Sequence, residues 1–262
     1  MILGIGCLIG ACDRDTKRVS APPTPTNQAP TTRAAVRETW VELPPAKWPQ
    51  FVLTNRAAFT GHTGLRGASG FLVRAADGRV LAATAKHLIG ENGGVEPEVP
   101  LRELDGALKS WVMFPRTDAK SIIEIDRLQL DVKNEESHDW LLMTVKSSEK
   151  LPAQPLLIRE TPVEVGESVF LIGVPYSERQ SAQNVYRGVV TKRGFKDRFR
   201  YTLSPPVDLR GFSGAPIVDA DGRAVGVMTV WFNGETVDGK DLDGGGEDIA
   251  TALRLLQRGR IE

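Results

Sequence analysis

Two stretches of this sequence have the pattern of a β-hairpin. Residues 70–84 hold two short apolar segments separated by an Asp-Gly pair at 77–78. The same layout returns in residues 215–230, around the Asp-Gly pair at 221–222. Because Asp-Gly favours the tight turns that join antiparallel strands, each stretch predicts a strand, a turn and a second strand.

The rest of the chain also alternates short apolar segments with turn residues, and only its end has a helical period. Ile249, Leu253 and Leu256 fall on one face of a helix expected over residues 248–258. Many short strands with one terminal helix are typical of an all-β sandwich or barrel. The other expected strands cover residues 122–125, 140–145, 168–173 and 185–191.

Composition narrows the possible function classes. The 262 residues carry 33 basic and 33 acidic side chains, and only 6% of the residues are aromatic. A nucleic-acid-binding chain usually has a basic excess or an aromatic stacking surface, so we expect no nucleic-acid partner. The length allows one or two domains.

Cysteine and histidine usage excludes several kinds of site. The two cysteines are Cys7 and Cys12, so the rest of the chain has no disulfide, no thiol nucleophile and no cysteine ligand for zinc. Three histidines occur, and no His-Glu-x-x-His motif is present. We therefore expect neither a metal ion nor a cofactor.

The first 12 residues are apolar and end in Gly10, Ala11 and Cys12. This run is far shorter than the roughly 20 apolar residues that cross a bilayer as a helix. It resembles the lipobox of bacterial lipoprotein signal peptides, although it lacks their basic region. The resemblance implies lipidation of Cys12, a membrane anchor, and an exported protein that faces the periplasm or the cell exterior. The alternative is a short apolar N-terminus with two incidental cysteines.

Residues 13–50 form the next predicted segment. Pro and Thr are dense in residues 20–30, where no apolar period is present. Such a segment buries too little surface to fold, so we predict a disordered, extended spacer. Trp40 and Trp48 indicate that order begins near them, and the folded domain is expected to span residues 51–262.

A glycine-flanked serine is the strongest local signal for chemistry, because residues 211–216 read G-F-S-G-A-P. A serine hydroxyl becomes a nucleophile when a base takes its proton and nearby donors stabilise the oxyanion that forms. Glycines beside Ser213 allow a sharp turn, so that the N–H groups of Gly211 and Ser213 can form one oxyanion hole. The alternative interpretation is a glycine-rich turn without catalytic function.

His87 and Asp139 are candidate partners of this serine. His87 follows one apolar strand segment and Asp139 opens another. In a triad the aspartate would fix the tautomer of His87, which would act as the base. Each residue also has a structural alternative, as a lone histidine or as a turn carboxylate. We expect His62 and His138 to be structural or surface residues. His138 is adjacent to Asp139, but neighbouring residues of a strand point to opposite faces, so both side chains should not reach the same site.

These segments resemble the regions around the triad of trypsin-like, chymotrypsin-fold serine proteases, in particular the bacterial HtrA-like branch. Residues 69–87 are similar to the family's S-G-F and T-A-A-H segments, and residues 139–142 to its D-[IL]-A-[LV] segment. Residues 211–216 are similar to its G-[DN]-S-G-G-P segment, with the hairpin in the same place after it. The similarity extends over residues 51–258, and no PDZ-like segment follows in this sequence.

The resemblance implies an all-β fold of two six-stranded antiparallel β-barrels packed together, with a C-terminal helix. It assigns the N-terminal barrel to residues 51–150 and the C-terminal barrel to residues 155–262. It also implies His87, Asp139 and Ser213 as the catalytic triad. The chain order His, Asp, Ser differs from the order Ser, acid, His of α/β-hydrolases.

Three departures from the family pattern lie beside these residues. Phe212 stands where animal digestive proteases have an aspartate that binds the new N-terminus after activation, so we expect no activation of that kind. Lys86 replaces the usual alanine before the histidine, and Ala215 replaces a glycine.

Substrate specificity depends, by the same resemblance, on the walls of the S1 pocket. Val207 near its floor favours small or apolar P1 residues, whereas Asp208 would favour a basic one. We expect an apolar preference. The predicted substrate-binding residues are Val207, Asp208, Thr229, Val230 and Trp231.

The sequence therefore predicts a serine endopeptidase that cleaves protein or peptide substrates through an acyl-enzyme intermediate. A different class of function is a catalytically latent, protease-like module that binds an extended peptide at a sheet edge. An acyltransferase or esterase with the same triad is a third possibility.

Overall fold

The computed structural model describes residues 37–129, 138–146, 150–178, 180–194, 197–233 and 242–258. Residues 1–36 lie outside this part of the chain, so the lipid anchor at Cys12 and the start of the spacer stay predictions. None of the described helices is both long enough and apolar enough to cross a membrane.

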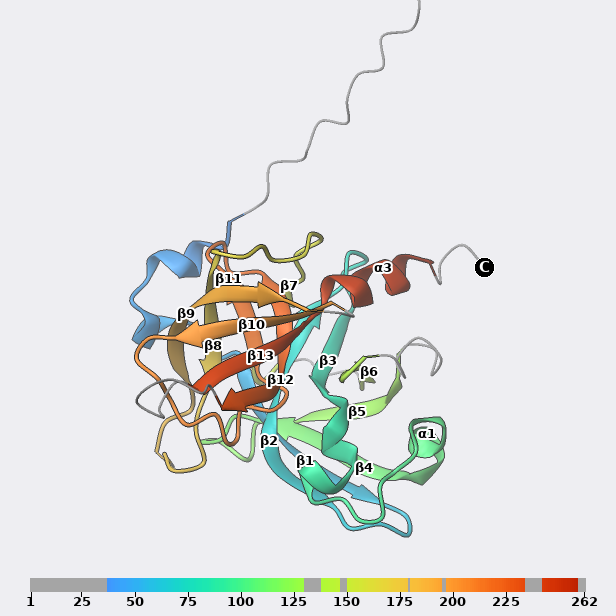
Figure 1. Cartoon of the computed structure of the whole chain (residues 1–262). Coiled ribbons are helices and arrows are strands. Elements are labelled where there is room, and N and C mark those ends of the chain that lie inside the picture. The colour runs from blue at the N-terminus through green and yellow to red at the C-terminus, as the bar shows by residue number, and fades with distance from the viewer. Residues whose placement is uncertain are drawn as a thin grey trace, which may run out of the picture. The chain divides into compact units, whose positions relative to one another are not determined.

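Six antiparallel strands close the N-terminal barrel in the order β1-β4-β5-β6-β3-β2, with β1 pairing back to β2 (Figure 1). A short strand, β7, adds to β2 in parallel. The strands are β1 (Val52–Phe59), β2 (Leu65–Arg74), β3 (Val80–Ala85), β4 (Leu108–Phe114), β5 (Ile123–Leu128), β6 (Trp140–Val145) and β7 (Leu156–Leu157). Short helices connect them: η3 (Lys86–Ile89), η4 (Glu91–Gly93), η5 (Leu101–Glu103) and α1 (Leu104–Ala107).

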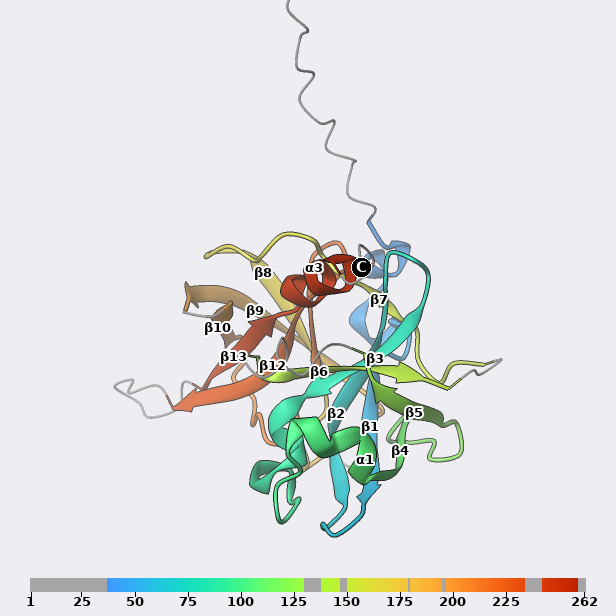
Figure 2. The ribbon, with the colours of Figure 1, turned by 90° about the vertical axis from the view of Figure 1, so that its right-hand side faces the viewer.

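Six further antiparallel strands close the C-terminal barrel in the order β10-β13-β12-β11-β8-β9. Helix α3 (Ala250–Arg258) follows and lies beside the β2–β3 turn of the first barrel (Figures 1 and 2). The predicted fold of two six-stranded barrels with a C-terminal helix is confirmed. The strands are β8 (Ser168–Gly173), β9 (Asn184–Arg193), β10 (Arg198–Leu203), β11 (Pro216–Asp219), β12 (Ala224–Asn233) and β13 (Leu242–Asp248).

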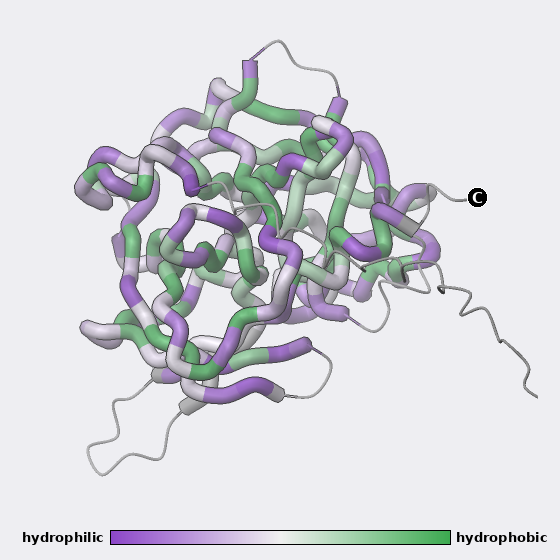
Figure 3. The backbone as a smooth tube through the Cα atoms, turned by 90° about the horizontal axis from the view of Figure 1, so that it is seen from above, coloured by the Kyte–Doolittle hydropathy of each residue, from purple (hydrophilic) through white to green (hydrophobic). Residues whose placement is uncertain are grey.

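The strands between the barrels are buried on both faces. In β2, Leu72 belongs to the core inside the N-terminal barrel, whereas its neighbours Phe71 and Val73 belong to a core shared by both barrels. Because successive side chains of a strand point to opposite faces, a strand covered on both sides needs a continuous apolar run. Many hydrophobic segments accordingly lie toward the inside of the molecule, while many peripheral turns are hydrophilic (Figure 3).

The folded part begins earlier than the sequence predicts. Residues 37–50, assigned above to the spacer, include the short helices η1 (Thr39–Glu42) and η2 (Pro45–Lys47). Trp40 and Trp48 pack edge to face, with ring centroids 4.7 Å apart, and both join the shared core. The burial of two large aromatic side chains offsets the conformational entropy that this segment loses when it becomes ordered. The predicted spacer boundary at residue 50 is therefore wrong.

Strand β13 was not predicted because its sequence, LDGGGED, has little strand propensity. A Cβ atom on Gly244 would lie 2.3 Å from the Tyr201 ring, and one on Gly246 would lie 2.5 Å from Ile217 Cδ1. Glycine is therefore required where this strand crosses the packed interior of the C-terminal barrel. Strands β1, β4 and β10 also lie outside the expected set.

Candidate active site

A cavity of about 520 Å³ contains all three predicted catalytic residues. His87 and Asp139 come from the N-terminal barrel, and Ser213 comes from the C-terminal barrel. Thr229 of β12 also lines it. The fold thus brings together side chains that lie far apart in the sequence.

His87 is held by Asp139 at two points. β3 ends at Ala85, which pairs with Trp140, so that the helical turn after β3 lies against the start of β6. Asp139 Oδ1 accepts the backbone N–H of His87 at 2.9 Å, and Oδ2 lies 2.9 Å from His87 Nδ1. An ionised carboxylate only accepts hydrogen bonds, so Nδ1 carries the proton and Nε2 is left as the basic atom.

Ser213 lies in a turn that only glycine can complete. Gly214 has φ +85°, and a Cβ atom there would lie 2.0 Å from the Ser69 carbonyl oxygen. That carbonyl accepts hydrogen bonds from Thr84 Oγ1 at 2.7 Å and from Asn55 Nδ2 at 2.8 Å. In return the Ser69 N–H donates to the Ser213 carbonyl at 2.8 Å. The serine is therefore anchored on strand β2 of the other barrel.

Two backbone donors at this turn have no acceptor. The N–H groups of Phe212, Gly214 and Ala215 each donate to a backbone carbonyl of the C-terminal barrel. Within the described part of the chain, the N–H groups of Gly211 and Ser213 have no such partner. These are the two donors that the sequence predicts for an oxyanion hole, and backbone donors without a partner are available to a ligand.

Tyr176, which the sequence analysis missed, fixes the orientation of one of these donors. Its N–H donates to the Arg210 carbonyl at 3.0 Å. Because the Arg210–Gly211 peptide is trans, its N–H points away from that carbonyl. The Tyr176 ring lies against Gly211, and its hydroxyl accepts the Ala68 N–H from the other barrel at 3.0 Å.

The hydroxyl of Ser213 is not yet engaged with the base. Among the described residues Ser213 Oγ has no hydrogen-bond partner, although it shares the cavity with His87. Catalytic hydrogen bonds are often long in the absence of substrate and tighten when it binds.

Only some of the predicted specificity residues line this cavity. Thr229 lines it, but Val207 packs against the interior of the C-terminal barrel. Asp208 forms an ion pair with Arg210 at 2.5 Å, and hydrogen bonds from that guanidinium hold the pKa of Asp208 below its ordinary value. The side chains of Val230 and Trp231 lie outside the described part of the structure.

The other two histidines lie away from the reacting atoms. His62 Nδ1 lies 2.7 Å from the Pro97 carbonyl oxygen, so this ring contacts the loop that contains Pro97. His138 is not a surface residue, because its side chain is only 10% exposed and its ring stacks on Trp140. It faces a buried carboxylate, Glu247, which the sequence analysis also missed.

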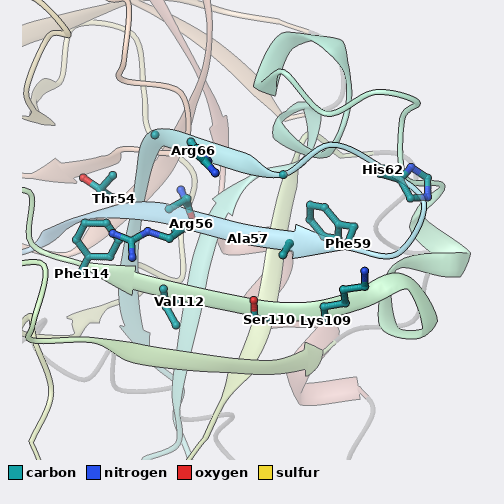
Figure 4. A pocket seen from close by; sticks show the side chains of 14 residues that line it. Thr54, Arg56, Ala57, Phe59, His62, Arg66, Lys109, Ser110, Val112 and Phe114 are labelled. Carbon is teal, nitrogen blue, oxygen red and sulfur yellow. The ribbon is translucent and has the colours of Figure 1, made fainter.

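A larger cavity, of about 770 Å³, lies on the outer face of β1, β2 and β4 (Figure 4). Arg56, Arg66 and Lys109 line it, and none of the predicted catalytic residues does. We assign the active site to the smaller cavity, since it holds a possible nucleophile, base and oxyanion donors. No group of three or more possible metal ligands occurs among the described residues.

Comparisons with known proteins agree with this fold. The Rv3671c protease from M. tuberculosis, in its active form, is similar with a TM-score of 0.51 and 18% sequence identity, over 90% of this chain and 93% of that chain. Its inactive form has a TM-score of 0.47 and 19% identity, over 80% of this chain and 88% of that chain. The family model for the trypsin-like peptidase domain matches residues 68–227. The chain belongs to the trypsin-like peptidase domain family.

Proposed function

We propose that this protein is a serine endopeptidase with His87, Asp139 and Ser213 as its catalytic triad. The observation that carries the proposal is the pair of 2.9 Å contacts from Asp139 to His87, in one cavity with Ser213. The two unpartnered N–H groups of Gly211 and Ser213 support it independently.

In this mechanism His87 Nε2 takes the proton of Ser213 Oγ as the oxygen attacks the carbonyl carbon of the substrate. The negative charge that forms on the carbonyl oxygen is stabilised by the N–H groups of Gly211 and Ser213. His87 then gives its proton to the leaving amine, and the acyl-enzyme remains. Water attacks this ester with His87 again as the base. The bond between the acyl carbon and Ser213 Oγ then breaks, His87 returns the proton to Oγ, and the carboxylic acid product leaves. Asp139 stabilises the imidazolium in both steps.

The substrate class follows from the family, as a protein or peptide. We propose a preference for an apolar P1 residue over a basic one. The carboxylate of Asp208 is already paired with Arg210, so it is a poor partner for a substrate cation.

A second candidate function is a latent peptidase-like module that binds an extended peptide. The free hydroxyl of Ser213, which lacks a hydrogen bond to His87 in the described structure, favours it. The two unpartnered N–H groups of Gly211 and Ser213 argue against it, because a module that only binds a peptide has no oxyanion to stabilise.

We also propose that Cys12 is lipidated and anchors the domain to a membrane, facing the periplasm or the cell exterior. The support is the apolar run before Cys12. Incorporation of a fatty-acid analogue into the wild type but not into Cys12→Ser would agree with this proposal.

The first prediction tests the nucleophile with a fluorophosphonate probe on the full-length protein. Wild type should be labelled, whereas Ser213→Ala and His87→Ala should lose labelling by about 10³-fold or more, because triad residues act as a unit. Ser110→Ala and His62→Ala are matched controls, since both residues line the other cavity. Labelling that survives in Ser213→Ala would refute the assignment. A folded wild type without labelling would favour the latent module.

A further inference from the structure

Glu247 is a fully buried carboxylate directly behind the proposed triad aspartate. Its side chain is 0% exposed. Oε2 accepts a hydrogen bond from the backbone N–H of Asp139. The contact joins β13 of the C-terminal barrel to the start of β6 in the N-terminal barrel.

The alternation of strand β13 explains why this side chain leaves its own barrel. Gly246 faces the barrel interior, where an added Cβ would meet Ile217 and Phe199. Glu247, the next residue, therefore points to the opposite face, where the N-terminal barrel lies. A glutamate is long enough to reach the Asp139 amide from that position.

The second oxygen of this carboxylate lacks a hydrogen bond. Glu247 Oε1 and His138 Nδ1 are both buried and without a hydrogen-bond partner among the described residues, and they lie 3.5 Å apart. Arg198, which pairs with Glu247 across the sheet, places its Nε 3.8 Å from the same oxygen. His138 and Arg198 are thus the cationic or potentially cationic groups that face Glu247, and Asp139 is the acidic one.

A buried carboxylate whose possible partners lie too far away for a hydrogen bond is not expected to stabilise the folded protein. Desolvation of an ionised carboxylate costs several kcal/mol, and replacing a buried ion pair with apolar side chains is often neutral or stabilising. Buried polar atoms without partners in a folded protein call for an explanation. Here the one hydrogen bond that Glu247 accepts through its side chain, among the described residues, is the bond from Asp139.

We propose that Glu247 is a positioning residue for Asp139 in the reaction proposed above, on which this inference rests. It accepts the Asp139 N–H and so fixes the backbone from which the carboxylate reaches both His87 N and His87 Nδ1. Arg198, and His138 when it is protonated, offset its charge.

The expected consequence is a loss of alignment between Asp139 and His87. Without the anchor, the Asp139 carboxylate would no longer be held against His87 Nδ1, and the imidazolium would lose stabilisation. Because His87 is the base in the proposed reaction, labelling of Ser213 should slow.

Three variants distinguish the contributions of the Glu247 side chain as a hydrogen-bond acceptor, as a charge and as a packed group. Glu247→Leu removes the acceptor and keeps the volume, so the protein should stay folded. Glu247→Gln keeps an oxygen that accepts the Asp139 N–H but removes the charge. Asp219→Asn is the matched control, because Asp219 is another buried carboxylate of this barrel, at the β11–β12 turn.

Two readouts are measured on the full-length protein. One is the fluorophosphonate labelling rate, and the other is the NMR resonance of the His87 Nδ1 proton, which reports the hydrogen bond to Asp139. With only three histidines in the chain, single substitutions of His62 and His138 assign the spectrum. This resonance does not require activity, so it tests Glu247 even if the proposed function fails.

We expect Glu247→Leu to slow labelling about tenfold or more and to shift or broaden the His87 Nδ1 proton resonance, while Glu247→Gln and Asp219→Asn stay within about threefold of wild type in labelling rate. A folded Glu247→Leu variant with an unchanged His87 Nδ1 resonance would overturn the inference. A Gln variant as impaired as the Leu variant would also overturn it, since charge rather than position would then be responsible. A wild type that is never labelled would count against the proposed function alone.

Discussion

At the scale of single residues, the turn around Ser213 depends on what a side chain would collide with. Gly214 is required by the Ser69 carbonyl, which a Cβ atom would approach to 2.0 Å. Gly211 has φ +101° and lies against the Tyr176 ring, with a Cβ distance of 3.1 Å. Both glycines allow the backbone conformation that places the groups of the proposed oxyanion hole, and a side chain at either position would displace them.

Gly211→Ala should therefore impair the chemistry more than the fold. The new methyl group would push against Tyr176 and rotate the peptide that carries the Gly211 N–H. We expect labelling to slow by about 10²-fold, as for loss of one oxyanion donor. Gly61→Ala is the control, since Gly61 has φ +78° but open space around its Cβ. Both variants should lose about 1–2 kcal/mol of stability from positive φ, and equal labelling rates would contradict the prediction.

At the scale of elements, helix α3 connects the two barrels through its apolar face. Ala252, Leu253 and Leu256 join the shared core together with Trp140 of β6. Asp248, the last residue of β13, lies just before this helix, and its Oδ1 accepts the Ala250 N–H at 2.8 Å. Side-chain capping of this kind satisfies a donor that the first turn of a helix leaves free.

Substitutions of Asp248 should distinguish the effect of its capping hydrogen bond on stability from the effect of its charge. Asp248→Ala removes the cap and should lower the free energy of unfolding by about 1 kcal/mol. Burial raises the pKa of Asp248, so its contribution to stability is full at low pH and is lost as the pH rises through that raised pKa. Asp248→Asn keeps the acceptor without the charge, and at neutral pH it should be at least as stable as wild type in urea denaturation. An Asn variant as unstable as the Ala variant would contradict this.

At the scale of the whole molecule, the proposed active site is shared between the barrels. Ser69 of β2 donates to the Ser213 carbonyl, and the Ala68 N–H donates to Tyr176. Glu247 of β13 accepts from Asp139 in return. Neither barrel holds a complete site, so activity requires that the two stay docked.

The segment that joins the barrels contains an ion pair that should make stability depend on pH. Arg159 contacts Glu167 with two hydrogen bonds, at 2.6 and 3.0 Å. These bonds lower the pKa of Glu167 from its ordinary value of 4.5, so its contribution is present above that value and is lost as the pH falls through the lowered pKa.

Glu167→Gln should therefore cost about 1 kcal/mol at pH 7, and the difference from wild type should shrink as the pH falls through the lowered pKa of Glu167. Urea denaturation at several pH values measures it. Glu124→Gln is the control, since Glu124 pairs with Lys146 on the exposed surface and should contribute little. A loss for Glu167→Gln that persists unchanged at low pH would show that the pair does not act through charge.

The sequence by itself determined what short-range chemistry controls. The Asp-Gly turns, the apolar strand segments and the helix near residue 250 depend on neighbouring residues, and the structure has them where they were expected. Ser213, His87 and Asp139 stood out because their residue types and chain order match a known pattern. Trp40 and Trp48 indicated order near them, but the domain boundary was placed at residue 51, because the burial of Trp40 depends on a core that forms elsewhere in the chain.

Only the tertiary structure decided which residues support these groups. Glu247 and Asp139 are 108 residues apart, as are Tyr176 and Ala68, and Ser69 Oγ reaches the Gly211 carbonyl over 142 residues. No local periodicity or turn preference encodes such pairs, since each exists only when one barrel packs against the other. Glu247 in a glycine-rich run has no distinctive neighbours in sequence, and its burial behind Asp139 follows from the closure of both barrels.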